Sequence, residues 1–66
     1  MPDRPATSEE RQHLRQWRTS AGLTQVQVAK SIGYTATSIC GWERGRTNVT
    51  IRQIALVATA CGVRHG

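Results

Sequence analysis

Three capping patterns of the same kind constrain the fold of this chain more than any other feature. A threonine followed three residues later by glutamate or glutamine occurs at 7–10, 24–27 and 50–53. In such a capping box the threonine hydroxyl and the acid or amide side chain satisfy free backbone N–H groups where a helix begins. Apolar residues at helical spacing follow each pattern. The chain is therefore predicted to form short, well-capped helices.

Glycines and threonines complete the boundaries of these helices. Glycine is common just after the last turn of a helix, and the four segments end at Gly22, Gly33, Gly45 and Gly62. Thr35 is expected to cap the third segment. The predicted helices run over about 8–20, 25–32, 35–44 and 51–61. No segment alternates between apolar and polar residues long enough for a strand, so the fold class is all-α.

The inner faces of these helices follow from the apolar spacing. We expect the buried side to contain Leu14, Trp17, Val28, Ile32, Ile39 and Trp42, completed by the apolar face of the fourth helix. Both tryptophans are thus interpreted as core residues and not as base-stacking platforms. Ala29 is small enough to let the second and third helices approach closely.

The length of the chain indicates one domain. At 66 residues it is near the lower limit for burying a self-sufficient core. Each helix cap contributes about 1 kcal/mol, a large fraction of the stability that such a small domain has. We expect a flexible N-terminal arm over 1–6, which contains Pro2 and Pro5, a folded domain over 7–63 and a C-terminal tail over 64–66.

The distribution of charge favours a polyanionic partner. From Arg11 onward there are eight basic residues and a single acid, Glu43, which gives this part a formal charge of +7. A basic surface of this kind is typical of proteins that bind nucleic acid. The alternative is a charged surface that only keeps the protein in solution.

Several other classes of function find no support in the sequence. Cys40 and Cys61 lack the spacing of metal ligands, and His13 and His65 do not complete a zinc site. A disulfide between the two cysteines is the less favoured alternative to two reduced thiols. No apolar run approaches the ~18 residues of a membrane span. With no signal peptide and reduced cysteines, we expect a cytoplasmic protein. No catalytic set is present, so we expect no enzymatic activity, and no metal, cofactor or small-molecule ligand is expected.

The central segment 24–43 predicts two short helices joined by a tight turn at Gly33, where glycine tolerates a positive φ. The run GLTQVQVAKSIGYTATSICGWERGR resembles the helix-turn-helix of the phage-repressor family, also described as Cro/C1-type or XRE-like. The matching elements are Gly22-Leu23-Thr24-Gln25, Ala29, Ile32-Gly33, Ser38-Ile39, Trp42-Glu43 and Gly45. The resemblance covers about 11–63. It implies a compact, lambda-repressor-like domain of four to five helices, with helix 35–44 inserted in the major groove of double-stranded DNA.

The resemblance also implies roles for individual side chains. Gln25 would bind a backbone phosphate at the N-terminus of the second helix, where free N–H groups suit an anion. Further phosphate contacts are expected from Thr35, Ser38, Arg44 and Arg46. For Thr35 and Ser38 a purely local role, as a cap and as a partner of nearby backbone, is an equally good alternative. For Arg44 and Arg46 the less favoured alternative is a solvated basic loop. Arg18 and Glu43 would form a structural ion pair, which can also position Arg18 for a phosphate.

The predicted base-reading face is unusual. If Ile39 and Trp42 point inward, the outward residues are Ala36, Thr37, Cys40 and Gly41. None of these can make the bidentate pairs that distinguish bases most strongly. We therefore expect either apolar and water-mediated contacts deep in the groove, or readout of DNA shape that involves Tyr34 and the arginines. For Cys40, a role as a small apolar contact is preferred to one as a redox sensor.

The function expected from these features is that of a sequence-specific, DNA-binding transcriptional regulator, a Cro-like repressor of phage or mobile-element type. It would occupy an operator in the cytoplasm of a bacterial host. A homodimer on two half-sites is one expected state, and a monomer in solution is another. The alternative function is a protein-interaction module, such as the antitoxin half of a toxin–antitoxin pair.

Overall fold

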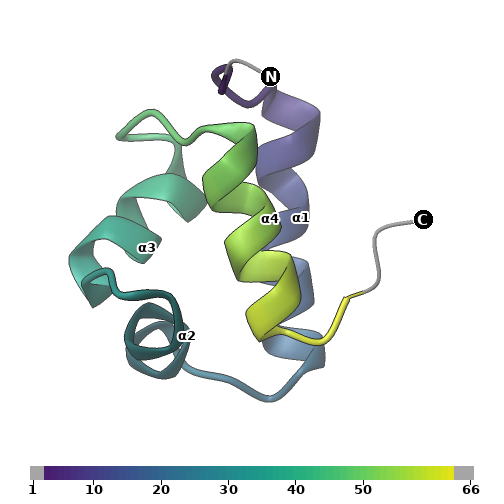
Figure 1. The fold of residues 1–66 in the computed structure, drawn as a ribbon, viewed down its shortest axis with the longest axis vertical. Coiled ribbons are helices and arrows are strands. Elements are labelled where there is room, and N and C mark those ends of the chain that lie inside the picture. Colours follow the sequence, from purple (N-terminus) through teal and green to yellow (C-terminus); the bar gives the residue numbers. More distant parts are fainter. Residues whose placement is uncertain (1–2, 64–66) are drawn as a thin grey trace.

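The computed structural model describes residues 3–63 and contains four helices in that range (Figure 1). The helices are α1 (Ser8–Ser20), α2 (Gln25–Ile32), α3 (Ala36–Arg44) and α4 (Ile51–Ala60). The prediction of an all-α fold is confirmed, and the helix bounds agree with those expected to within about one residue. The predicted tail over 64–66 lies outside the described residues.

The predicted caps form as the sequence indicated. Thr7, Thr24 and Thr50 each accept a hydrogen bond from the third backbone N–H of their helix, and the side chain at that position bonds back to the cap. Thr35 caps α3 by accepting from the backbone N–H of Ser38 at 3.2 Å. Because these bonds satisfy N–H groups that have no partner within a helix, they fix where each helix begins.

The helices surround one core. α1 and α4 lie side by side, while α2 and α3 cover the other side of the molecule (Figure 1). Every helix contributes to the buried cluster, which comprises Leu14, Val28, Ala29, Ile39, Trp42, Val49, Ile54 and Val57. Trp17, Ile32 and Leu23 are partly buried against it. Val49 is fully buried although it lies in the loop before α4, where helical periodicity does not predict a core residue.

The segment before α1 packs against the start of α4. Within the range expected as a flexible arm, residues 3–6 are hydrogen-bonded to residues 49–52, with Ala6 N–H donating to the Val49 carbonyl at 2.7 Å. The Ile51 N–H donates to the Arg4 carbonyl at 2.9 Å, and the Arg52 N–H donates to the Asp3 carboxylate at 3.0 Å. These bonds give the first amides of α4 acceptors that the helix itself cannot supply, and the flexibility of the arm over 1–6 stays a prediction.

Candidate nucleic-acid interface

The turn between α2 and α3 has the geometry that the sequence predicted. Gly33 ends α2 with φ of 79°, in the left-handed region, and Tyr34 N–H donates to the Ala29 carbonyl at 2.9 Å. Only glycine adopts this conformation without steric strain. Ala29, just 2% exposed, lies in the core shared by the two helices. This arrangement leaves one face of α3 open to solvent.

An ion pair joins α1 to the end of α3. Arg18 Nε donates to Glu43 Oε2 at 2.7 Å and Arg18 Nη2 donates to Glu43 Oε1 at 3.0 Å. The side chains are 14% and 5% exposed, and these hydrogen bonds to Glu43 raise the pKa of Arg18 above its ordinary value. The structural pair expected between these residues is therefore present. The third nitrogen, Nη1, donates to the Leu23 carbonyl at 3.0 Å, so the guanidinium is engaged on every nitrogen.

Gln25 belongs to the same network. Its side-chain amide donates to Glu43 Oε1 at 3.2 Å, which fixes the amide at the start of α2. Glu43 thus accepts bonds from both α1 and α2. The only acid after Glu10 is held by two partners, and its charge is opposed by the Arg18 guanidinium.

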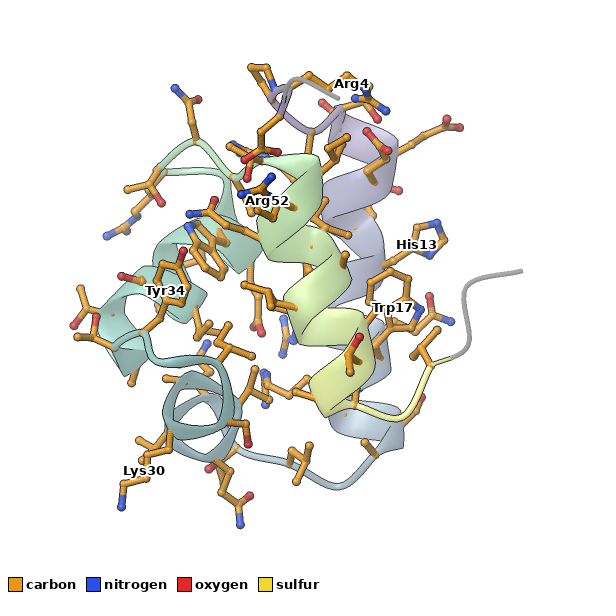
Figure 2. All side chains as sticks on the ribbon, viewed as in Figure 1. Arg4, His13, Trp17, Lys30, Tyr34 and Arg52 are labelled. Atoms are coloured by element: carbon orange, nitrogen blue, oxygen red, sulfur yellow. The ribbon has the colours of Figure 1, made fainter. Side chains whose placement is uncertain are left out.

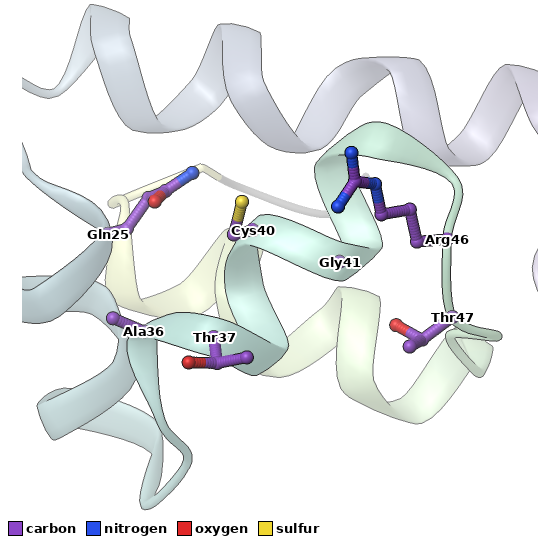
Figure 3. Close-up of a pocket in the computed structure, with 7 residues that line it drawn as sticks. All are labelled: Gln25, Ala36, Thr37, Cys40, Gly41, Arg46 and Thr47. Carbon is purple, nitrogen blue, oxygen red and sulfur yellow. The ribbon is translucent and has the colours of Figure 1, made fainter.

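Two adjoining hollows lie on this face and share Gln25. The first, called here the apolar hollow, has a volume of about 380 Å³ and is lined by Gln25, Ala36, Thr37, Cys40, Gly41, Arg46 and Thr47 (Figure 3). The second, called here the basic hollow, has a volume of about 140 Å³ and is lined by Arg15, Arg18, Gln25, Glu43 and Arg44. The lining of the first is mostly apolar and that of the second mostly polar.

The apolar hollow brings together the residues expected to read bases, with one correction. Thr37 is exposed, and Ala36 and Cys40 are half-buried. Gly41 was expected to face outward, but it is buried. A Cβ added there would lie 2.7 Å from Thr47 Oγ1, so Gly41 is the place where the loop after α3 packs directly on the helix.

The predicted phosphate-binding residues do not form one cluster. Arg44 is exposed at the basic hollow and Arg46 is exposed at the apolar hollow. Thr35 and Ser38 are bonded to each other, both through the cap and between their hydroxyls at 3.1 Å, so the local capping role proposed for them is present. Their contact with phosphate stays a prediction, as do those of Gln25, Arg44 and Arg46.

Sequence reasoning missed three residues that shape this face. Arg15 lines the basic hollow beside Arg44, and its place one turn before Arg18 on α1 was the signal that could have revealed it. Arg11 Nη2 donates to the Thr47 carbonyl at 2.7 Å and so ties the loop after α3 to α1. Thr47 in turn lines the apolar hollow. The bond from Arg11 spans 36 positions, so no local pattern could have predicted it.

The aromatic residues have structural contacts. Tyr34 packs edge-on against Trp42, with ring centroids 5.0 Å apart, and its hydroxyl accepts a hydrogen bond from Gln53 at 3.2 Å. Trp42 is only 4% exposed. The half-buried Trp17 stacks on the exposed His13, with ring centroids 5.5 Å apart, and both residues belong to α1 (Figure 2). Tyr34 is 37% exposed, which leaves it accessible at the turn.

Within residues 3–63 no group of three or more His, Cys, Asp or Glu side chains could hold a metal ion. Cys40 and Cys61 are free thiols. None of the helices in this range is long and apolar enough to cross a membrane.

Comparisons with known proteins agree with this geometry. A helix-turn-helix domain model matches residues 11–66. Among solved structures, the chain is similar to the restriction-modification controller protein C.AhdI from Aeromonas hydrophila, with 36% identity and a TM-score of 0.75. The match covers 85% of this chain and 81% of that one. No curated protein matches.

Proposed function

The chain belongs to the helix-turn-helix domain family, and we propose that it is a sequence-specific transcriptional regulator that inserts α3 in the major groove of double-stranded DNA. The observation that carries this proposal is the pair of adjoining hollows on the open face of α3, bordered by exposed arginines. The similarity to a protein described as a restriction-modification controller supports a regulatory role.

The charges on this face suit the backbone of DNA. Arg15 and Arg44 border the basic hollow, and Arg46 borders the apolar hollow. Glu43 contributes little repulsion because Arg18 pairs with it. Positive side chains that flank a reading helix neutralise phosphates and release counterions, which drives binding at low salt.

The shape of α3 suits close approach to the groove. The major groove is about 12 Å wide, and a helix with its side chains has a diameter of about 10–12 Å. Small side chains at Ala36, Thr37 and Cys40 reduce the width of α3 on the exposed face. The Arg11 bond to the Thr47 carbonyl holds the adjoining loop in place, so Arg46 is carried by a fixed segment of backbone.

In finer detail, we propose a repressor of phage or mobile-element type that excludes polymerase or a competing regulator from an operator. Its site of action would be the cytoplasm of a bacterial host. Two copies would bind two half-sites as a homodimer on DNA, since half-site spacing matches the symmetry of such dimers.

The test is the salt dependence of DNA binding. Replacing Arg44 or Arg46 with alanine should weaken binding to all sequences and lower the slope of log K against log salt by about 0.9 for each lost phosphate contact. Lys30→Ala is the matched control, because Lys30 is exposed on α2 and lines neither hollow. Unchanged slopes for both arginine variants would contradict the phosphate assignment.

A protein-interaction module remains the second candidate. The observation that favours it is the absence of any long polar side chain on the exposed face of α3 between Ala36 and Gly41, within the described chain. A fluorescence-anisotropy titration against random duplex separates the two functions. Salt-dependent binding supports the regulator, and no binding at low salt supports the interaction module.

A further inference from the structure

The apolar hollow has an unusual lining for a surface that faces nucleic acid. α3 supplies only Ala36, Thr37, Cys40 and Gly41, and the two long polar side chains come from outside the helix (Figure 3). Of these, the Gln25 amide is already bonded to Glu43. The floor of the hollow therefore offers methyl groups, a thiol and bare backbone, with few groups that could form a bidentate hydrogen bond to a base edge.

Gly41 and Thr47 pack closely together in the lining of this hollow. Gly41 contributes no side chain, and Thr47 lies so close that a Cβ on Gly41 would approach Thr47 Oγ1 to 2.7 Å. Thr47 is itself held by the bond from Arg11 to its carbonyl. Gly41 and Thr47 therefore form a closely packed part of the lining, which the Arg11 bond connects to α1.

Only one group in the major groove matches this lining. Each base pair presents hydrogen-bond donors and acceptors there, and the sole apolar group is the methyl on C5 of thymine. 5-Methylcytosine carries a methyl at the same ring position. A donor or acceptor buried against apolar atoms without a partner is destabilising, whereas a methyl group gains free energy when it leaves water.

The arginines define which ligand reaches the hollow. Arg46 is one of its lining residues, and the basic hollow with Arg15 and Arg44 adjoins it at Gln25. A free apolar small molecule would not use this charge, but a methyl carried by a polyanionic duplex would. The charge and the apolar lining therefore point to the same ligand.

We propose that the apolar hollow is a receptor for the 5-methyl group of a pyrimidine in the DNA major groove. This inference rests on the proposed DNA-binding function and adds to it the chemical class of the base that α3 reads. Thymine and 5-methylcytosine share the recognised group, and unmethylated cytosine lacks it.

The first experiment removes the methyl and nothing else. An operator is selected from a random duplex pool, and each thymine is replaced in turn by deoxyuridine. Burying one methyl is worth about 0.8 kcal/mol, which corresponds to about a four-fold change in Kd. We expect a loss of about that size at one or two thymines in each half-site. At those positions cytosine should bind more weakly than 5-methylcytosine by a similar factor.

Protein variants assign the effect to the hollow. Thr37→Ser removes a methyl from the lining, and Ala36→Leu fills the space, so both should reduce the ratio of the Kd for deoxyuridine to the Kd for thymine. Ala55→Leu is the control, because Ala55 is exposed on α4 and lines neither hollow. Circular dichroism establishes that each variant is folded.

The possible outcomes distinguish the methyl-receptor proposal from the proposed function as a DNA-binding regulator. Equal binding of the thymine and deoxyuridine duplexes at every position overturns the methyl receptor but leaves the regulator intact. A deoxyuridine penalty that neither Thr37→Ser nor Ala36→Leu alters also overturns it, because the penalty then arises elsewhere. Failure to select any operator, together with no salt-dependent binding, overturns both.

Discussion

Replacing Arg18 with methionine should remove much of the stability of this domain. The substitution keeps a long apolar stem but leaves Glu43, which is 5% exposed, without its cation. Removing one partner of a buried ion pair typically costs about 3–5 kcal/mol. A 66-residue domain has a total stability of roughly 3–10 kcal/mol at the usual value per residue. The single variant should therefore lose about a third or more of its stability.

The double variant Arg18→Met, Glu43→Leu should recover most of that loss. Replacing a buried pair by apolar residues of similar size is often neutral or stabilising. The carbonyl of Leu23 loses its bond from Arg18 in both the single and the double variant, so this effect cancels in the double-mutant cycle. We expect a coupling free energy of about 3 kcal/mol between the two positions.

Urea denaturation followed by far-ultraviolet circular dichroism measures all four proteins of the cycle. The shift in the midpoint at constant slope gives the change in the free energy of unfolding. A coupling below about 1 kcal/mol, the value typical of exposed pairs, would refute the reasoning. So would a double variant that is as unstable as the sum of the two single variants.

The other predictions concern acid, packing and backbone. Arg4 and the Thr7 N–H lower the pKa of Glu10 to about 2. The ionised Glu10 therefore contributes its full stabilisation above its ordinary pKa of 4.5, and this stabilisation is lost as the pH falls toward 2. The difference in thermal midpoint between the wild type and Glu10→Gln should shrink as the pH falls through that range, and a constant difference would contradict this. Gly41→Ala should destabilise the protein by about 1 kcal/mol, since overpacking costs about 1–3 kcal/mol and alanine regains about 1 kcal/mol of helix propensity. In a Thr47→Ala variant, the same Gly41→Ala substitution should instead be stabilising. An equal loss of stability from Gly41→Ala in the wild type and in Thr47→Ala would show that Thr47 is not the obstacle. Gly33→Ala should lower the free energy of unfolding by about 1–2 kcal/mol, because alanine is strained at the positive φ of this position. Urea denaturation measures this change, and an unchanged stability would contradict the expected strain.

The helices and their caps were predictable because their signals are local. Each capping box joins residues only three positions apart, and each apolar face repeats within one or two turns. A glycine at position 33 predicts a positive φ, because a tight turn between helices requires one and glycine tolerates it. The Arg18–Glu43 pair links positions distant in the sequence, and the resemblance to a known family supplied it.

Contacts that cross the fold could not be predicted from these signals. Val49 is a core residue in a loop, where no period marks its inner face. Gly41 lies on the side of α3 predicted to face outward, and its burial depends on where the loop returns with Thr47. The apolar hollow depends on the same loop, because the loop places Arg46 and Thr47 in its lining. Four of its lining residues are those predicted to read bases, but their sequence does not reveal a concave surface.

The bonds between residues 3–4 and the start of α4 have a consequence for folding kinetics. The Ile51 N–H donates to the Arg4 carbonyl across 47 positions (51 to 4), and the Arg52 N–H donates to the Asp3 carboxylate across 49 positions. Local helix contacts form early, but a bond of this range requires closure of a long loop. We therefore expect this closure to be a late step in folding and an early one in unfolding. The amides of Ile51 and Arg52 should then exchange with solvent faster than those in the middle of α4, and their rates report how often the two ends of the fold separate.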